Sequence, residues 1–126
     1  MIFDTDILIW IERGNIRAAK FLQEAPLRTI SLQTYLELMQ CAKDKKQQKR
    51  SREFLRDFRI RVLPLSEKIG FRASVYIDQF SCSHGLHAGD AIIAATAVEY
   101  GLQLCSANIK HYKVIPDLDF KAFKPG

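Results

Sequence analysis

The chain begins Met1-Ile-Phe-Asp-Thr-Asp-Ile-Leu-Ile-Trp10, where a short apolar run meets two acids and then a second apolar segment. The run over residues 1–4 is too short for anything but a strand, and residues 7–13 have the apolar spacing of a helix. Gly14-Asn15 then interrupts the pattern. A strand that leads at once into a helix is therefore the first unit of this chain.

Strands and helices continue to alternate downstream. Further strands are predicted over residues 27–31, 60–65, 102–105 and 120–123, and helices over 16–24, 32–43, 50–58, 66–80 and 90–100. The polar segment 44–49 is predicted to connect two helices, and residues 81–89 to form a loop. This order predicts an α/β fold, a three-layer α/β/α sandwich with a mostly parallel central sheet of four to five strands.

Length and composition favour one ordinary globular domain over residues 1–126, with 48% hydrophobic residues. No apolar run approaches the roughly 20 residues that cross a bilayer, and the acidic start does not resemble a signal peptide. Cys41, Cys82 and Cys105 are too few and too scattered for a disulfide framework. These features predict a cytoplasmic protein with no membrane contact.

Three carboxylates stand where an apolar run meets the start of a helix: Asp4, Glu37 and Asp90. Acidic side chains are almost never fully buried unless something pairs with them. A hard divalent ion such as Mg²⁺ or Mn²⁺ takes oxygen ligands, keeps some waters and binds phosphate oxygens. The three acids together therefore indicate a metal-dependent phosphodiesterase.

Sheet topology brings most of these groups to one edge, because ligands in such folds collect beyond the carboxyl ends of the strands. Asp4, Glu37 and Asn108 all follow strand ends and should converge there. Asp90 precedes its strand, so we expect it to join them only if the loop over residues 81–89 runs back across the sheet.

Each acid also has a plain structural interpretation as a helix cap. Asp4 could cap the first helix, although Asp6 is better placed to do so. Glu37 could fold back in a capping box, unless Ser31 is the cap, in which case Glu37 needs another explanation. Asp90 could be the N-cap of the helix that follows it.

Basic residues outnumber acidic ones by 19 to 14, and nine of the 19 fall within residues 43–61. A basic face beside an acidic pocket suits an enzyme that cuts a polyanion, because the face collects phosphates. The alternative is a solvated helix face that meets an acidic partner protein. The candidate RNA-binding residues are Lys43, Lys45, Lys46, Lys49, Arg50 and Arg52.

Other chemistry has little support. The spacing of Cys82, His84 and His87 does not match the usual zinc ligand pairs. His111 is interpreted as a surface or phosphate-contacting residue rather than a metal ligand. No Gly-rich phosphate loop of the nucleotide-triphosphatase type is present.

Four motifs in order resemble the PIN-domain family, and within it the VapC-type ribonuclease toxins. They are Ile2-Phe-Asp-Thr-Asp6, Ile30-Ser-Leu-Gln-Thr-Tyr-Leu-Glu-Leu38, Leu86-His-Ala-Gly-Asp-Ala-Ile-Ile-Ala-Ala95 and Leu104-Cys-Ser-Ala-Asn-Ile-Lys-His-Tyr112. The resemblance spans nearly the whole chain. It implies a PIN-like fold, Mg²⁺- or Mn²⁺-dependent endoribonuclease activity, a homodimer, and a cognate VapB-like antitoxin.

Carried over by position, the resemblance makes Asp4, Glu37, Asp90 and Asn108 the catalytic residues and the three acids the metal ligands. Many family members have aspartate where this chain has the neutral Asn108, so a second metal should be held less tightly. Without metal the crowded acids should repel, and at least one should have a raised pKa. Supporting roles fall to Asp6, Ser31, Thr34 and Ser106.

Two alternatives remain open. The opening Phe3-Asp-Thr-Asp6 is similar to the Asp-x-Asp start of haloacid-dehalogenase-type phosphatases, but Leu8 stands where that family has Thr or Val. The second alternative is a basic module that binds RNA or an antitoxin without catalysis and whose acids are only helix caps.

Overall fold

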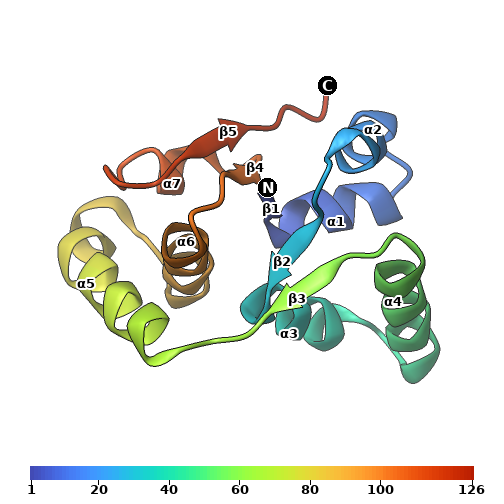
Figure 1. Ribbon diagram of the computed structural model, residues 1–126, viewed down its shortest axis with the longest axis horizontal. Coiled ribbons are helices and arrows are strands. Elements are labelled where there is room, and N and C mark those ends of the chain that lie inside the picture. Colours follow the sequence, from blue (N-terminus) through green and yellow to red (C-terminus); the bar gives the residue numbers. More distant parts are fainter.

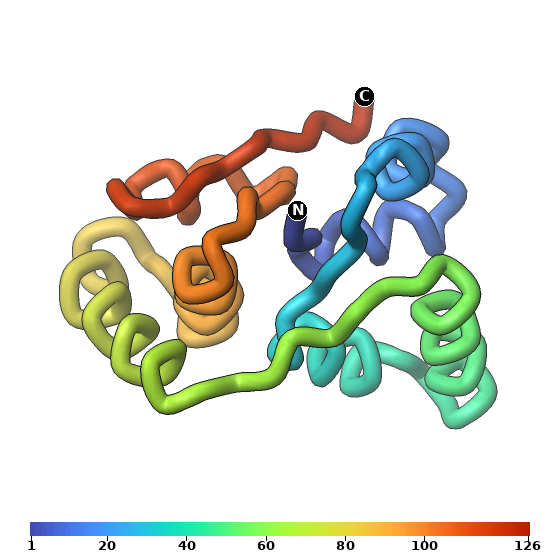
Figure 2. Tube along the Cα trace, viewed as in Figure 1, coloured from blue at the N-terminus to red at the C-terminus, as the bar shows by residue number.

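The computed structural model describes residues 1–126 and contains one five-stranded sheet with the strand order β3-β2-β1-β4-β5. Every neighbouring pair is parallel, which confirms the predicted α/β sandwich. The chain trace shows the N-terminal strand in the middle, between β2 and β4 (Figure 2). The strands are β1 (Ile2–Phe3), β2 (Thr29–Ser31), β3 (Arg61–Leu63), β4 (Leu104–Ser106) and β5 (Phe120–Ala122).

Seven helices cover the two faces of the sheet (Figure 1). Side chains alternate across a strand, so Ile2 packs into one core and its neighbour Phe3 into the other. The first core also holds α5, α6 and α7, and the second holds α1 to α4. The helices are α1 (Thr5–Glu12), α2 (Ile16–Glu24), α3 (Leu32–Cys41), α4 (Lys45–Asp57), α5 (Glu67–His84), α6 (Ala88–Tyr100) and α7 (Ile109–Tyr112).

The predicted connection over residues 44–49 is wrong, because α4 begins at Lys45. Asp44 is the N-cap, and its Oδ1 accepts a hydrogen bond from the backbone N–H of Gln47 at 2.8 Å. The polar residues that suggested a loop are the solvent-exposed face of the first turns of a helix. Polarity alone does not separate a loop from the exposed first turns of a helix when the buried residues of that helix are only Ser51 and Leu55.

The predicted loop over residues 81–89 is also wrong, because α5 continues to His84 and only residues 85–87 separate it from α6. Gly85 ends α5 in the left-handed conformation, with φ of 68°. Gly101 ends α6 in the same way, as the sequence predicts. The two helices pack against each other through fully buried alanines of α6, whose small side chains allow close approach.

The helices α5 and α6 together connect β3 to β4. The 18 residues of α5 span roughly 27 Å at about 1.5 Å per residue, so no long loop is needed before α6. From α6 the chain enters β4 through residues 101–103. A helix that runs antiparallel to the strand that follows it begins at the carboxyl edge of the sheet. The expectation that Asp90 needs a loop over residues 81–89 to reach this edge was therefore wrong.

The chain direction across the sheet reverses between β1 and β4. The first three strands step to one side, as β1, β2 and β3, and β4 then pairs with the opposite side of β1. Ligands bind at such a switch point in open α/β sheets. Separately, none of the helices has the length and apolar content to cross a membrane.

Candidate active site

Asp4 follows β1 directly at the switch point and is 5% exposed. Its Oδ1 accepts the backbone N–H of Thr5 at 2.7 Å, and its Oδ2 accepts the hydroxyl of Ser106 at 2.6 Å. Asp4 is the N-cap of α1, so the expectation that Asp6 would serve as this cap is wrong. Oδ1 caps the helix, and Oδ2 faces Ser106 at the end of β4.

Asp6 lies in the first turn of α1 and turns toward the same strand end. Its Oδ2 accepts the backbone N–H of Ala107 at 2.9 Å and lies 3.2 Å from the hydroxyl oxygen of Ser106. Its Oδ1 is buried without any hydrogen-bond partner. A buried carboxylate oxygen without a partner is costly, so this atom indicates room for a cation or a polar ligand.

Glu37 lies beyond the first turn of α3, and Ser31 is the N-cap of that helix. The capping-box interpretation of Glu37 therefore fails. Thr5 Oγ1 donates to Glu37 Oε1 at 2.5 Å, and Gln33 Nε2 donates to Oε2 at 3.3 Å. Both contacts hold the carboxylate beside the start of α1.

The Glu37 carboxylate also lies against the backbone of α6. A Cβ built on Gly89 would come within 2.8 Å of Glu37 Oε2 and 3.2 Å of Gln33 Nε2. A side chain here would require the end of Glu37 to move. Gly89 directly precedes Asp90, so this contact joins Glu37 of α3 to the turn of α6 that carries Asp90.

Asp90 is the third residue of α6, and the N-cap is His87, so the cap interpretation of Asp90 is wrong. Its Oδ1 accepts the hydroxyl of Tyr112 at 3.4 Å, and its Oδ2 lies 3.1 Å from His111 Nδ1. His111 is half-buried and contacts this predicted ligand, which the interpretation as a surface residue did not anticipate.

Asn108 precedes α7 and lies next to the same histidine. Its backbone N–H donates to Ser106 Oγ at 2.9 Å, and its Nδ2 is 3.1 Å from His111 Nδ1. Thr34 is fully buried, with its Oγ1 3.1 Å from Thr5 Oγ1. The hydroxyl and amide groups thus form a chain of contacts that links the ends of β1, β2 and β4.

Burial and the charges of neighbouring acids raise the pKa values of Asp4 and Asp6. Burial first, and then the charge of Asp6, raise the pKa of Asp4 from 3.8 to about 7. Burial also raises the pKa of Asp6. The pKa of Tyr112 rises well above 10 because of burial and then the charges of Asp4 and Asp90. One of the three predicted ligands therefore has a raised pKa, as expected, but burial and the charge of Asp6 contribute more to the rise than the charge of Asp90 does.

This arrangement fits a divalent cation. The predicted ligands Asp4, Glu37 and Asp90 offer carboxylate oxygens, and the neighbouring Asp6 has a buried Oδ1 without a hydrogen-bond partner. The cost of gathering these negative charges falls when a cation is bound. Sequence reasoning missed Thr5, Gln33, Gly89 and Tyr112. Thr5 and Tyr112 stood inside the quoted motifs, and the contact across Gly89 had no sequence signal.

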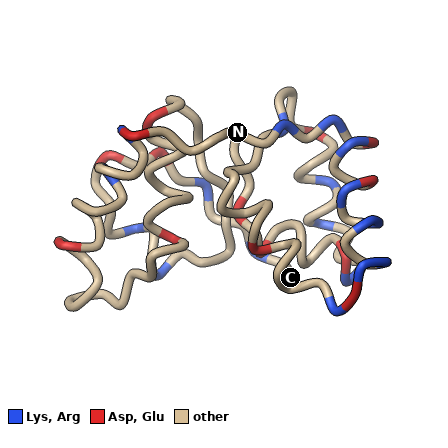
Figure 3. The backbone as a smooth tube through the Cα atoms, turned by 90° about the horizontal axis from the view of Figure 1, so that it is seen from below, with Lys and Arg blue, Asp and Glu red and all other residues tan.

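The six candidate RNA-binding residues are all exposed, five of them on α4 and Lys43 just before it. In Figure 3 the blue segments that mark Lys and Arg are concentrated on this helix at one end of the molecule. None of them contacts the carboxylates. The structure therefore separates a basic face from the acidic site rather than merging them.

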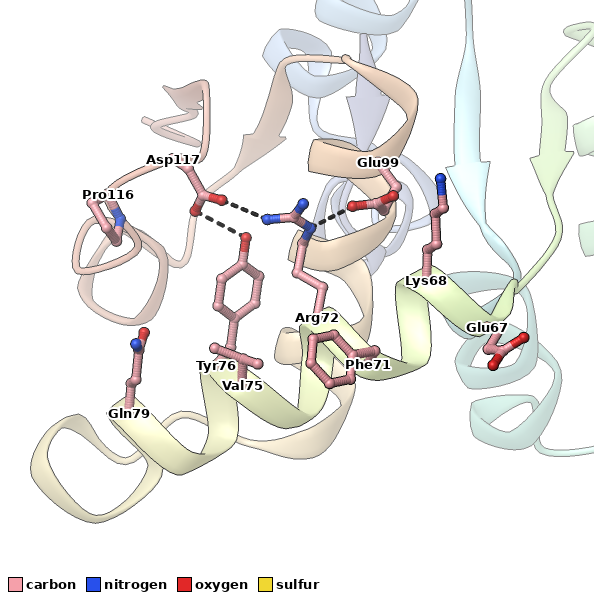
Figure 4. Close-up of a pocket in the computed structure, with 10 residues that line it drawn as sticks. All are labelled: Glu67, Lys68, Phe71, Arg72, Val75, Tyr76, Gln79, Glu99, Pro116 and Asp117. Carbon is pink, nitrogen blue, oxygen red and sulfur yellow. Dashed lines mark hydrogen bonds and ion pairs between the residues drawn. The ribbon is translucent and has the colours of Figure 1, made fainter.

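A cavity of about 840 Å³ lies away from these residues, between α5, α6 and the segment before β5 (Figure 4). Arg72 occupies it and bonds to Glu99 at 2.6 Å and to Asp117 at 2.8 Å, and the Tyr76 hydroxyl donates to Asp117 at 2.9 Å. These charges satisfy one another. Volume alone would select this cavity, but its chemistry gives it no reactive group.

Residues 1–115 match the family model of the PIN domain. A chain of a toxin–antitoxin complex from Klebsiella pneumoniae is 32% identical, with a TM-score of 0.79, over 99% of this chain and 97% of that one. VapBC-1 from nontypeable Haemophilus influenzae is 26% identical, with a TM-score of 0.77, over 97% and 98%. VapBC2 from Rickettsia felis, bound to a promoter DNA fragment, has the same fold at 23% identity, with a TM-score of 0.81, over 98% and 100%. No curated protein sequence matches the chain.

The contact between Gly89 and Glu37 predicts a change in metal binding without loss of the fold. In Gly89→Ala the new methyl group displaces the flexible end of Glu37, so the stability should change little. We expect the Mn²⁺ affinity, measured by calorimetric titration, to fall by about tenfold. Gly70→Ala on α5 is the matched control, because a Cβ there meets nothing within 4 Å. Equal Mn²⁺ affinity in both variants would contradict this role for Glu37.

The raised pKa of Asp4 predicts how the stability of the metal-free protein depends on pH. The folded state keeps a proton on Asp4 up to about pH 7, whereas the unfolded chain releases it near 3.8. The stabilisation is therefore complete below the unfolded value and is lost as the pH rises toward 7, by on the order of a few kcal/mol.

Urea unfolding of the metal-free protein between pH 4 and pH 8 measures this effect. The difference in stability between the wild type and Asp4→Asn should change across that range, in favour of the variant at high pH. Parallel curves for the two proteins would show that Asp4 titrates normally in the folded state.

Proposed function

The chain belongs to the PIN-domain family, and we propose that it is a metal-dependent endoribonuclease that acts as the toxin of a type II toxin–antitoxin pair. The observation that carries the proposal is the meeting of Asp4, Glu37 and Asp90 at the switch point of the sheet. Contacts of Thr5 with Asp4 and Glu37, of Glu37 with the backbone at Gly89, and of Tyr112 with Asp90 support this grouping.

Asp4, Glu37 and Asp90 would hold Mg²⁺ or Mn²⁺. When bound, the ion would neutralise phosphate charge and lower the pKa of a water molecule that attacks the phosphodiester. The remaining side chains orient these ligands. Ser106 fixes the Asp4 carboxylate, and Thr5 fixes that of Glu37.

Asn108 would act on the substrate side of the site. Its side-chain amide lies next to His111 after the end of β4, where it can orient water or a phosphate oxygen. Asp6 supports the site from α1 through Ala107 and Ser106. Because Asn108 is neutral, the proposed chemistry requires only one carboxylate-bound ion.

RNA is the proposed substrate, and the exposed basic residues of α4 are the proposed phosphate-binding face. This face is separate from the acids, so it would hold RNA at a distance from the cut bond. The family match gives the phosphatase alternative no support. Experiment can distinguish the nuclease from a module that binds RNA or an antitoxin without catalysis, because such a module does not need the carboxylates.

The proposed partner is a VapB-like antitoxin, supported by the 32% identical chain in the Klebsiella pneumoniae toxin–antitoxin complex. A homodimer is also proposed, on the family resemblance. One sheet with both faces covered supports the single-domain prediction for residues 1–126.

Asp4→Asn tests catalysis directly. The variant keeps the size of the side chain and an amide oxygen that can accept the Thr5 N–H, but it loses the charge that would hold the ion. RNA cleavage with Mg²⁺ or Mn²⁺ should fall by at least about a hundredfold, while RNA binding persists. Asp78→Asn, an exposed acid of α5 without a partner, is the matched control and should cleave normally. Undiminished cleavage by Asp4→Asn would support the non-catalytic module.

The basic face is tested by charge removal away from the site. In a double variant, Lys45→Gln with Lys46→Gln, RNA affinity should fall and the salt dependence should weaken by about 0.7 in log–log slope for each lost single-strand phosphate contact. A control with the same net charge is Lys20→Gln with Lys124→Gln, near α2. If both pairs weaken RNA binding equally, the effect comes from net charge and not from the α4 face.

A further inference from the structure

Two histidines, His87 and His111, lie beside Asp90. Asp90 Oδ2 lies 3.1 Å from His111 Nδ1 and 3.9 Å from His87 Nδ1. All three ligand atoms lie within 4.8 Å of one another. The two imidazole rings meet edge to face with centroids 5.5 Å apart. Two nitrogens and one carboxylate oxygen thus converge from the start of α6 and from α7.

The separations suit one metal ion. With bonds of roughly 2.1 Å, two ligand atoms about 90–110° apart on one ion lie roughly 3.0–3.4 Å from each other. The pair formed by Asp90 and His111 already has this spacing. His87 Nδ1, at 3.9 Å from Asp90 Oδ2, would have to come closer to that oxygen by roughly 0.5–0.9 Å.

Two of the ligands are held in place and the third is free to adjust. Asp90 and His111 are 19% and 21% exposed, and Tyr112 and Asn108 contact them. His87 is 80% exposed and makes no side-chain cap bond at the start of α6. Such a site would bind a metal ion when the exposed His87 imidazole moves toward the pair formed by Asp90 and His111.

We propose that His87, Asp90 and His111 form a second metal position that takes a transition-metal ion such as Mn²⁺, Co²⁺ or Zn²⁺ in preference to Mg²⁺. Imidazole nitrogen suits these ions, whereas Mg²⁺ prefers oxygen ligands only. Asp90 borders both positions, so it would link the second ion to the one held with Asp4 and Glu37. The use of this ion in RNA cleavage rests on the proposed function, but its binding does not.

Titration of the full chain with Co²⁺ alone tests the site, because the visible absorption of Co²⁺ reports imidazole ligands directly. His87→Gln and His111→Gln should each lower the Co²⁺ affinity by at least about tenfold. The Mg²⁺ affinity, measured by calorimetry, should change by less than about twofold. His84→Gln is the matched control, because this exposed histidine lies in the same segment but outside the cluster.

The opposite result overturns the proposal: a Co²⁺ spectrum and affinity that are the same in the wild type and in both histidine variants. His111 would then serve only as a hydrogen-bond partner of Asp90. Because His87 is exposed, His87→Gln should fold normally and decides the question even if His111→Gln does not fold.

Asp4→Asn separates this inference from the proposed function. The variant should keep the Co²⁺ absorption of the histidine site while losing RNA cleavage. If it retains cleavage, the proposed function fails, and the Co²⁺ titration still decides the histidine site. If it loses cleavage while the histidine variants bind Co²⁺ normally, the function stands and the second site does not.

Discussion

The hydroxyl of Ser106 at the end of β4 is the contact on which the site depends. It donates to Asp4 and also lies within hydrogen-bond distance of Asp6, and it accepts the backbone N–H of Asn108. It reaches these groups only because β4 pairs in parallel with β1. That pairing follows from the reversal of strand order between β3 and β4, which the α5–α6 hairpin makes possible.

Burying several acids at the end of β4 costs free energy, and nearby backbone N–H groups offset this cost only in part. The backbone N–H groups of Thr5 and Ala107 stabilise the charged forms of Asp4 and Asp6. Burial and mutual repulsion outweigh them, as the raised pKa of Asp4 shows. The free protein therefore gathers negative charge in a poorly solvated place, and a bound cation would remove most of that cost. Sites that bind ions commonly concentrate such unfavourable interactions.

Local patterns in the sequence were good guides where a short segment decides its own conformation. The strand before Asp4, the cap at Ser31 and the left-handed residue Gly101 all follow from neighbouring residues, and the structure has each of them. Local reasoning was wrong over residues 44–49 and 81–89, where polar or small side chains belong to helices. Packing on one side of a helix can stabilise a turn whose own residues look like a loop.

The acids themselves could be selected from the sequence, because a carboxylate at the junction of an apolar strand and a helix is unusual. Their partners could not. The approach of Glu37 to Gly89 and of His111 to Asp90 joins segments far apart in the chain, and no periodicity encodes such contacts.

The sequence by itself determined the order of the strands and of every helix except the short α7, the alternation that makes the sheet parallel, and the identity of the acids. Only the tertiary structure decided which oxygens and nitrogens lie within reach of one ion. Like charges repel, so no local preference brings these side chains together. They meet because burial of the two apolar faces of the sheet, a much larger free energy, holds the strand ends side by side.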